Sequence, residues 1–278
     1  LYTSIVMWKS LNLLDRRNII LLRELIVTDF KLRYQGSVLG YVWSVLKPLF
    51  LFAILYVVFV HILRLDRGIP HFPVTMLLGI VLWSFFTEAT SNGLGSILNI
   101  GDLIRKLNFP KYIIVISGTV SSLINLFINL GVVLIFILLN GVSLSWTALL
   151  IVPLIIELYI FSLGIALLLS VFNVKYRDTS YIWEIFLQAA FYAAPIIYPI
   201  QMALERSRVA AELLFMNPVT QIIQDARYAL INQDGSIIRS TDLIHDWRII
   251  FPWIVIIVTV ILGIYCFSKR SRYFAEDI

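Results

Sequence analysis

Apolar runs alternate with short polar segments along the chain, and the runs are long enough to cross a membrane. A helix needs about 20 mainly apolar residues to span the hydrocarbon layer. The run 112–156 contains no Asp, Glu, Lys or Arg and is too long for one span, so the polar turn at 140–146 divides it. The pattern predicts six transmembrane helices, at 37–63, 72–90, 112–139, 147–172, 179–199 and 249–268.

Two further segments have the pattern of amphipathic helices that do not span. In 18–34, charged residues interrupt apolar ones that recur every three or four positions, which predicts a helix in the cytoplasmic interface leading into the first span. In 217–231, an Asn-Pro start precedes a similar apolar spacing. This segment is expected to form an external helix that rests on the bundle.

The composition supports an integral membrane protein and excludes an ordinary soluble domain. Hydrophobic residues make up 60% of the chain and charged residues 14%, and the mean hydropathy is +0.89. So few charges cannot cover the surface of a soluble domain of 278 residues. A single cysteine, Cys266, and histidines without ligand spacing predict neither an intramolecular disulfide nor a metal site.

The basic residues are sorted by side of the predicted bundle. Fifteen of the 22 Lys and Arg residues fall on the side that holds both chain ends and the loops at 91–111 and 173–178. Cytoplasmic loops of membrane proteins are enriched in Lys and Arg, so both ends are predicted to be cytoplasmic. This sorting accounts for the basic pI of about 9.3 without a nucleic-acid partner.

The entry to the first span, LRYQGSVLGYVWSVLKPLF at 32–50, combines basic and aromatic residues. Aromatic rings gather at membrane interfaces, and the Lys47 ammonium reaches headgroup level from just inside the span. Two interpretations remain open. The segment anchors the helix, or Arg33, Tyr34 and Lys47 flank a site for an anionic lipid headgroup.

The predicted cytoplasmic loop 91–112 is too long for a simple turn and contains the short charged stretch DLIRKLNF. Asp102 lies at its N-terminal end, and Arg105 and Lys106 lie towards its C-terminal end, an order that suits a helix dipole. Such a transverse helix is a means of docking onto a cytoplasmic partner. The alternative is a loop that positive charge anchors at the membrane.

Three acidic residues, Glu88, Glu157 and Glu184, lie inside apolar segments. A carboxylate within the membrane is costly and therefore marks a candidate functional site. Glu88 and Glu184 lie near the ends of spans, whereas Glu157 is deep. Glu157 is either a proton relay, or protonated or paired across helices.

Aromatic residues cluster at 82–86 (LWSFF) and 191–199 (FYAAPIIYP). Aromatic faces stack on the C–H faces of sugar rings, so the clusters indicate either a sugar path or ordinary packing. Pro195 and Pro199 break the fifth helix, and broken backbone at membrane depth is tolerated where it lines protein or a water-filled cavity. The chain contains no Gly-Lys pair and hence no phosphate-binding P-loop, so ATP-driven work requires another chain.

Four stretches together resemble the membrane subunit of ABC-2 polysaccharide exporters, the family of O-antigen, capsule and wall teichoic acid permeases. They are RYQGSVLGYVWSVLKPL, GSILNIGDLIRKLNFPKYIIVIS, YRDTSYIWEIFLQAAFYAAPIIYP and MNPVTQIIQDARYAL. They occur in order from residue 33 to about 230.

The resemblance implies an all-α fold: a cytoplasmic segment 1–36 with an interfacial helix, and a six-span domain 37–278. It also implies a coupling helix at 97–107 and re-entrant gate helices within 200–231, and it leaves 232–248 unassigned. The implied assembly in the bacterial inner membrane is a homodimer with two copies of a separate ATPase, which would carry the ATP and Mg. The implied cargo is a polyprenyl-diphosphate-linked glycan.

Carried onto this chain, the resemblance suggests two sets of residues. The ATPase-coupling candidates are Asn99, Asp102, Leu103, Arg105 and Lys106. The channel candidates are Trp83, Phe86, Phe191, Tyr192 and Tyr198. Two other functions remain: an ABC-2 exporter of a lipid or drug, and a proton-coupled secondary transporter that uses Glu157 or Glu184 and needs no ATPase.

Overall fold

The computed structural model describes residues 16–34, 40, 42–62, 71–101, 104, 109–231 and 237–274, without the side chains of 30 and 32–34. Within these ranges the chain forms helices and no strand. Five helical segments are long and apolar enough to cross a membrane, so the chain is a multi-pass membrane protein. They are Val42–Ile62 (α3 with η1), Phe72–Asn99 (α4), Tyr112–Leu139 (α6), Trp146–Lys175 (η2 with α7) and Trp247–Arg270 (η3 with α13).

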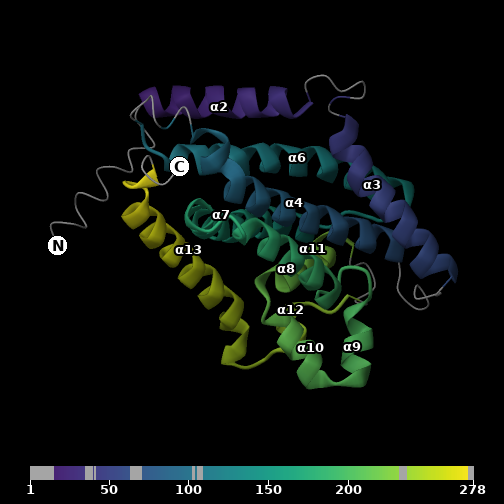
Figure 1. The fold of residues 1–278 in the computed structure, drawn as a ribbon. Coiled ribbons are helices and arrows are strands. Elements are labelled where there is room, and N and C mark those ends of the chain that lie inside the picture. The colour runs from purple at the N-terminus through teal and green to yellow at the C-terminus, as the bar shows by residue number, and fades with distance from the viewer. Residues whose placement is uncertain are drawn as a thin grey trace.

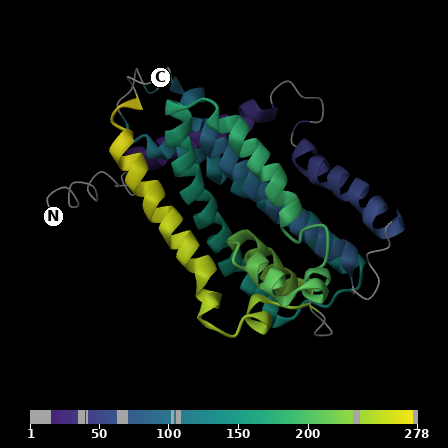
Figure 2. The same cartoon turned by 60° about the horizontal axis from the view of Figure 1, so that its bottom comes forward.

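Helix α4 lies at the centre of the bundle. Both α6 and α7 pack along it, and α13 packs on the far side of α7. Helices α3 and α13 lie at opposite sides of the molecule (Figures 1 and 2), and most of their surface is exposed. Apolar side chains exposed on such helices are suited to lipid or to another membrane chain.

One end of the bundle is closed by a compact apolar cluster. It joins the end of α4, the start of α6, and the ends of α7 and α13, with Ile97, Ile104, Ile114 and Phe274 among its buried members. Lys111 links the start of α6 to the end of α13, because its Nζ donates to the carbonyl oxygen of Ser271 at 2.6 Å. The ends of these four helices therefore meet at one side, as the predicted topology requires.

The predicted amphipathic helix is present as α2, Arg16–Tyr34. It lies alongside α6 (Figure 1), and Leu25 packs against the apolar cluster at the bundle end. Ile19, Ile20 and Val27 remain exposed on its other side. The apolar face thus divides between the protein and the surroundings, and a position in the membrane interface stays a prediction.

Two spans end well away from the predicted position. The second continues as helix to Asn99, nine residues beyond the expected end at 90, because Gly93 lets α4 approach α7 closely: a Cβ there would lie 2.3 Å from Ala166 Cβ. The fifth is shorter: α8, Thr179–Ala193, has 15 residues. It ends because Ala194, which precedes Pro195, is extended, as the residue before a proline tends to be. The described ranges thus contain five helices of spanning length where the sequence predicted six spans.

The chain between α8 and the last span folds into short helices at one end of the molecule (Figures 1 and 2). They are α9 (Ile200–Arg206), α10 (Arg208–Phe215), α11 (Pro218–Ile231) and α12 (Ser240–Leu243), and η3 (Trp247–Ile250) then begins the last span. Helices α9, α10 and α12 share an apolar cluster that includes Ile200, Phe215 and Leu243. The described part of 232–248, which the sequence left unassigned, thus packs with α9 and α10. We call α9, α10 and α12 together the external unit.

Helix α11 corrects one prediction. It was expected to rest on the outside of the bundle, yet most of its residues are buried, and it packs against α4, α7, η2 and α13. Because Gln221, Gln224 and Arg227 are polar, the sequence suggested that one face of this helix contacts water. In the structure they make hydrogen bonds inside the protein.

Candidate functional site

Four of the five aromatic residues predicted to line a channel form a continuous series of ring contacts between α4 and α8, and Tyr198 lies outside that series. The ring of Trp83 lies 5.5 Å from that of Phe86 and 6.0 Å from that of Phe191, centroid to centroid. Phe191 in turn meets Tyr192 edge-on at 5.4 Å. Such offset and edge-on contacts add to the stabilisation from burial. The sequence clusters 82–86 and 191–199 are therefore brought together in space.

The members of this series differ in exposure, and exposure separates two kinds of role. Trp83 and Phe86 are buried, whereas Tyr192 is 67% exposed. Tyr198 is partly buried, and its hydroxyl donates to the carbonyl oxygen of Ala193 at 2.9 Å, so it caps the end of α8. Among these predicted channel residues, Tyr192 is the most exposed and is therefore open to a cargo in a single chain.

Trp183, which the sequence did not single out, fixes α8 to α4. Its indole N–H donates to Thr90 Oγ1 at 3.2 Å, and its ring stacks on Phe186 with centroids 5.0 Å apart. Phe186 is exposed. Further exposed side chains continue the same face of α8, namely Tyr181, Ile182, Ile185 and Tyr192. We call these four with Phe186 the open face of α8.

A polar seam runs between α4 and α6 and reaches α3. Asn125 donates to Glu88 Oε1 at 2.7 Å, which gives this acidic residue a partner across the helices. One turn later, Asn129 donates to the carbonyl oxygen of Ser44 on α3 at 3.1 Å. Hydrogen bonds between helices hold membrane bundles together where apolar packing gives little preference. The four-residue spacing of Asn125 and Asn129 within an uncharged run was a readable signal that sequence reasoning missed.

Arg227 anchors α11, and sequence reasoning missed this residue too. It is buried, and its guanidinium donates to three backbone carbonyl oxygens: Thr75 at 3.0 Å, Pro195 at 2.7 Å and Ile196 at 2.7 Å. Gln224 Oε1 accepts a fourth bond at 3.1 Å. Burial lowers the pKa of Arg227 to about 10, so it is charged at neutral pH.

The partners of Arg227 explain why the fifth span can break. The carbonyl groups of Pro195 and Ile196 lie just beyond α8, where the helix no longer supplies donors. An unpaired carbonyl group in the bundle interior is costly. The forked guanidinium pairs both and also binds the first turns of α4 through Thr75. Three segments distant in sequence thus meet at one side chain.

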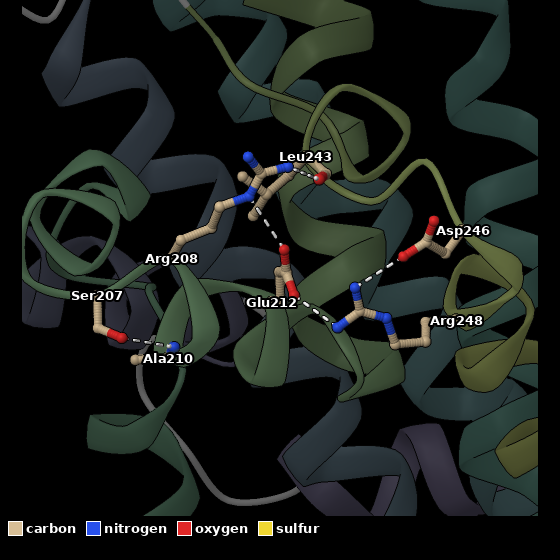
Figure 3. Close-up of polar contacts among 7 residues, drawn as sticks. All are labelled: Ser207, Arg208, Ala210, Glu212, Leu243, Asp246 and Arg248. Atoms are coloured by element: carbon tan, nitrogen blue, oxygen red, sulfur yellow. Dashed lines mark hydrogen bonds and ion pairs between the residues drawn. The ribbon is translucent and has the colours of Figure 1, made fainter.

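The external unit is joined to the last span by a chain of four alternating charges (Figure 3). Glu212 on α10 accepts from Arg208 at 3.1 Å and from Arg248 at 2.6 Å, and Arg248 also donates to Asp246 at 2.9 Å. Because Glu212 is buried and Arg248 begins the last span, this contact fixes α10 against that span. Ser207 caps α10 by accepting from the backbone N–H of Ala210.

The structure places only part of the predicted coupling and entry sites. Asn99 is exposed at the end of α4, while Asp102, Leu103, Arg105 and Lys106 lie outside the described residues. Ile104, between them, is buried in the apolar cluster at the bundle end. At the entry site, Lys47 is exposed on α3, and the side chains of Arg33 and Tyr34 are not among those described. Both assignments stay predictions.

Within the described part of the chain, no group of three or more His, Cys, Asp or Glu residues has the arrangement of a metal site. The buried polar groups instead join helices to one another. Glu88 accepts from an amide, Glu212 accepts from Arg248, and Arg227 donates to backbone carbonyl oxygens.

Comparison with known proteins agrees with this architecture. Residues 20–231 match the family described as ABC-2 type transporter. An O-antigen export system permease protein RfbA of Klebsiella pneumoniae is 30% identical over 251 residues, covering 89% of this chain and 91% of that protein. An RfbA permease of Myxococcus xanthus is 28% identical over 203 residues, covering 73% and 77% respectively. Because the family match extends over most of the chain, this protein belongs to the ABC-2 type transporter family.

Proposed function

We propose that this chain is the transmembrane subunit of an ATP-driven exporter that moves a polyprenyl-diphosphate-linked polysaccharide across the bacterial inner membrane. The observation that carries the proposal is the similarity, along nearly the whole chain, to permeases named for O-antigen export. The open face of α8 supports it, since exposed rings such as Phe186 and Tyr192 suit the C–H faces of sugars.

The exporter in this proposal is a homodimer with two copies of a separate ABC ATPase, and ATP and Mg bind there. Membership of the ABC-2 family supports association with such an ATPase. The segment 97–107 is its docking site in the proposal. Buried Ile97 and Ile104 would transmit movement of this segment to α4, α6 and α13, which share their cluster. Both chain ends and the docking site face the cytoplasm.

In this proposal, the cargo enters the protein beside α3. Lys47 is exposed on α3, and α3 packs only lightly on the rest of the chain. With Arg33 and Tyr34, Lys47 would receive the diphosphate of the lipid carrier. An ammonium and a guanidinium are suited to phosphate oxygens. A helix with few contacts is the natural one to move aside.

The test is export in a cell that lacks its own copy of the gene and carries the chain together with its ATPase. Surface polysaccharide and lipid-linked polymer retained in the cell are both measured. We expect export with the unaltered chain. We expect retention of the polymer with Arg105→Glu and Lys106→Glu combined, at unchanged membrane abundance and with loss of co-purifying ATPase.

A matched control replaces Lys269 and Arg270 with Glu at the same end of the bundle, and export should continue. Polymer on the surface of cells carrying the Arg105 and Lys106 replacements would refute the docking site. Transport of a lipid or drug but no polymer would favour the other ABC-2 function. Export that survives ATP depletion would favour the secondary transporter.

A further inference from the structure

The first span contains a proline inside its helix, and that proline removes a backbone hydrogen bond. Pro48 lies within α3, which runs from Val42 to Tyr56. In an α-helix, each backbone N–H donates to the carbonyl oxygen four residues earlier. A proline has no N–H, and its ring also crowds that carbonyl group. Pro48 therefore cannot supply the helical donor for the carbonyl oxygen of Ser44.

This carbonyl oxygen of Ser44 receives a donor from another helix. Asn129 Nδ2 of α6 donates to it at 3.1 Å. The same Nδ2 donates to the carbonyl oxygen of Asn125, one turn earlier in α6, at 2.8 Å. Because both neighbours are acceptors, the nitrogen and not the oxygen of the amide must face them. The Asn129 amide thus directs one N–H within α6 and the other at α3.

The bond belongs to a face along which α3 and α6 meet more than once. Two turns beyond Ser44 and Asn129, the ring of Phe52 on α3 meets the ring of Phe136 on α6 edge-on, with centroids 5.8 Å apart. Phe52 and Asn129 are both buried. The hydrogen bond is therefore part of a packed contact between the two helices.

Helix α3 depends on few contacts for its position. Of the five described spans, the one that contains α3 is the least buried. In lipid, a backbone carbonyl group without a donor is costly, and a proline within a span is tolerated where a neighbouring helix pairs the freed group. On a lightly packed helix, one such bond is a large part of what fixes its position.

We propose that Asn129 replaces the donor that Pro48 removes from α3, and that this bond positions α3 on α6. Asn129 is thus a positioning residue for the helix beside which the cargo enters, and for that role the inference rests on the proposed function. Because the bond joins two helices, α3 can separate from α6 without breaking a hydrogen bond of its own helix. A helix without Pro48 would pair the Ser44 carbonyl group itself and would lose this link.

A double-mutant cycle between Pro48 and Asn129 tests the replacement of the donor. Pro48→Ala restores an N–H that can donate to Ser44 within α3. Asn129→Leu removes the amide and keeps a side chain of similar size. The measurement is equilibrium unfolding of the purified full-length protein in a detergent titration. We expect Asn129→Leu to raise the unfolding equilibrium constant about fivefold more with Pro48 present than with Pro48→Ala, the effect of one hydrogen bond between membrane helices.

Asn125→Leu is the matched control for this cycle. Asn125 is also buried in α6, but its amide donates to Glu88 of α4 and not to α3. Its replacement should therefore have the same effect with Pro48 and with Pro48→Ala. Equal effects of Asn129→Leu in the two backgrounds would overturn the proposal. If Asn129→Leu alone does not fold, Pro48→Ala must recover folding, and failure to recover it would overturn the proposal as well.

The position of α3 is measured by the distance between spin labels on α3 and α13, which lie at opposite sides of the molecule (Figures 1 and 2). Ile54→Cys and Ile261→Cys carry the labels at exposed positions, in a Cys266→Ser chain mixed with excess unlabelled protein. We expect Asn129→Leu to broaden the distance distribution. The distribution should stay broad when Pro48→Ala is added, because the added N–H restores the carbonyl's donor and not the link to α6. An unchanged distribution in Asn129→Leu would overturn the positioning role.

Both measurements are made on purified protein without cargo, so they judge the inference separately from the proposed function. An absent coupling between Pro48 and Asn129 in a chain that exports polymer rejects the inference alone. A coupling of the expected size in a chain that exports no polymer rejects the proposed function, and Asn129 then remains the link between α6 and α3.

Discussion

Gly79 and Arg227 occupy adjoining space in the bundle. A Cβ on Gly79 would lie 2.7 Å from Arg227 Nη2, closer than a Cβ carbon approaches other atoms in real proteins. The same Nη2 donates to the carbonyl oxygen of Ile196 at 2.7 Å. The missing side chain of Gly79 on α4 thus gives Arg227 of α11 its room at the break that follows α8.

Gly79→Ala is expected to lower the free energy of unfolding by about 1–3 kcal/mol, the usual cost of overpacking. The guanidinium must shift, and its bonds to the carbonyl groups weaken. Chemical or thermal unfolding of the purified protein measures the effect. Gly131→Ala is the control, because a Cβ there meets nothing within 4 Å. Equal stability of the two variants would contradict the contact.

Arg227→Met is expected to cost more, on the order of 3 kcal/mol, because it leaves several buried carbonyl groups without a donor. Arg227→Lys should recover only part of this loss, since one ammonium cannot reach carbonyl groups on three segments. Unfolding and limited proteolysis after α8 report the change. Full stability of Arg227→Lys would mean that charge alone matters. Arg206→Met, at an exposed position of α9, serves as the control.

Two arginines bind Glu212, and they are expected to differ in importance. Arg208 lies four residues earlier and its side chain is 65% exposed, so Arg208→Met should have little effect. Arg248 is half as exposed and joins α10 to the last span, so Arg248→Met should free the external unit. The rate of proteolytic cleavage within 201–246 measures this release. Equal rates for the two variants would show that Arg248 does not hold the unit.

Replacing a buried member of the aromatic series is expected to lower stability, whereas replacing an exposed member is expected to lower export. Trp83→Ala should cost about 3–5 kcal/mol of stability, as removal of a buried aromatic ring does. Tyr192→Ala should leave the unfolding midpoint unchanged and reduce export. The measurements are thermal unfolding and surface polysaccharide for both variants. Normal export by a stable Tyr192→Ala protein would remove this ring from the proposed path.

The spans were the most predictable part of the fold. The third is expected at 112–139 and observed at Tyr112–Leu139, because a long apolar run with a polar turn after it leaves few other arrangements. The break at Pro195 was also readable, since a proline restricts the residue before it. The length of α4 was not, because SNGLGSILN has the composition of a loop. Its helix depends on close packing against Ala166.

The candidate site was less predictable because its residues meet through tertiary contacts. Arg227 and Thr75 are 152 positions apart, and no local pattern connects them. The polar residues of α11 have the spacing of a solvent-facing side, yet Gln221 and Arg227 are satisfied inside the bundle. Glu88 was recognisable as an acid within an apolar segment, but its partner Asn125 was not.

The sequence by itself determined that the chain enters the membrane and where most of its spanning helices lie. Those properties follow from composition and periodicity, which act locally through the cost of exposing polar backbone to lipid. Only the tertiary structure decided that α11 is buried, that Arg227 closes the broken helix, and that Asn125 of α6 binds Glu88 of α4. Hydrogen bonds of this kind depend on which distant segments pack together, and residue order alone does not specify that.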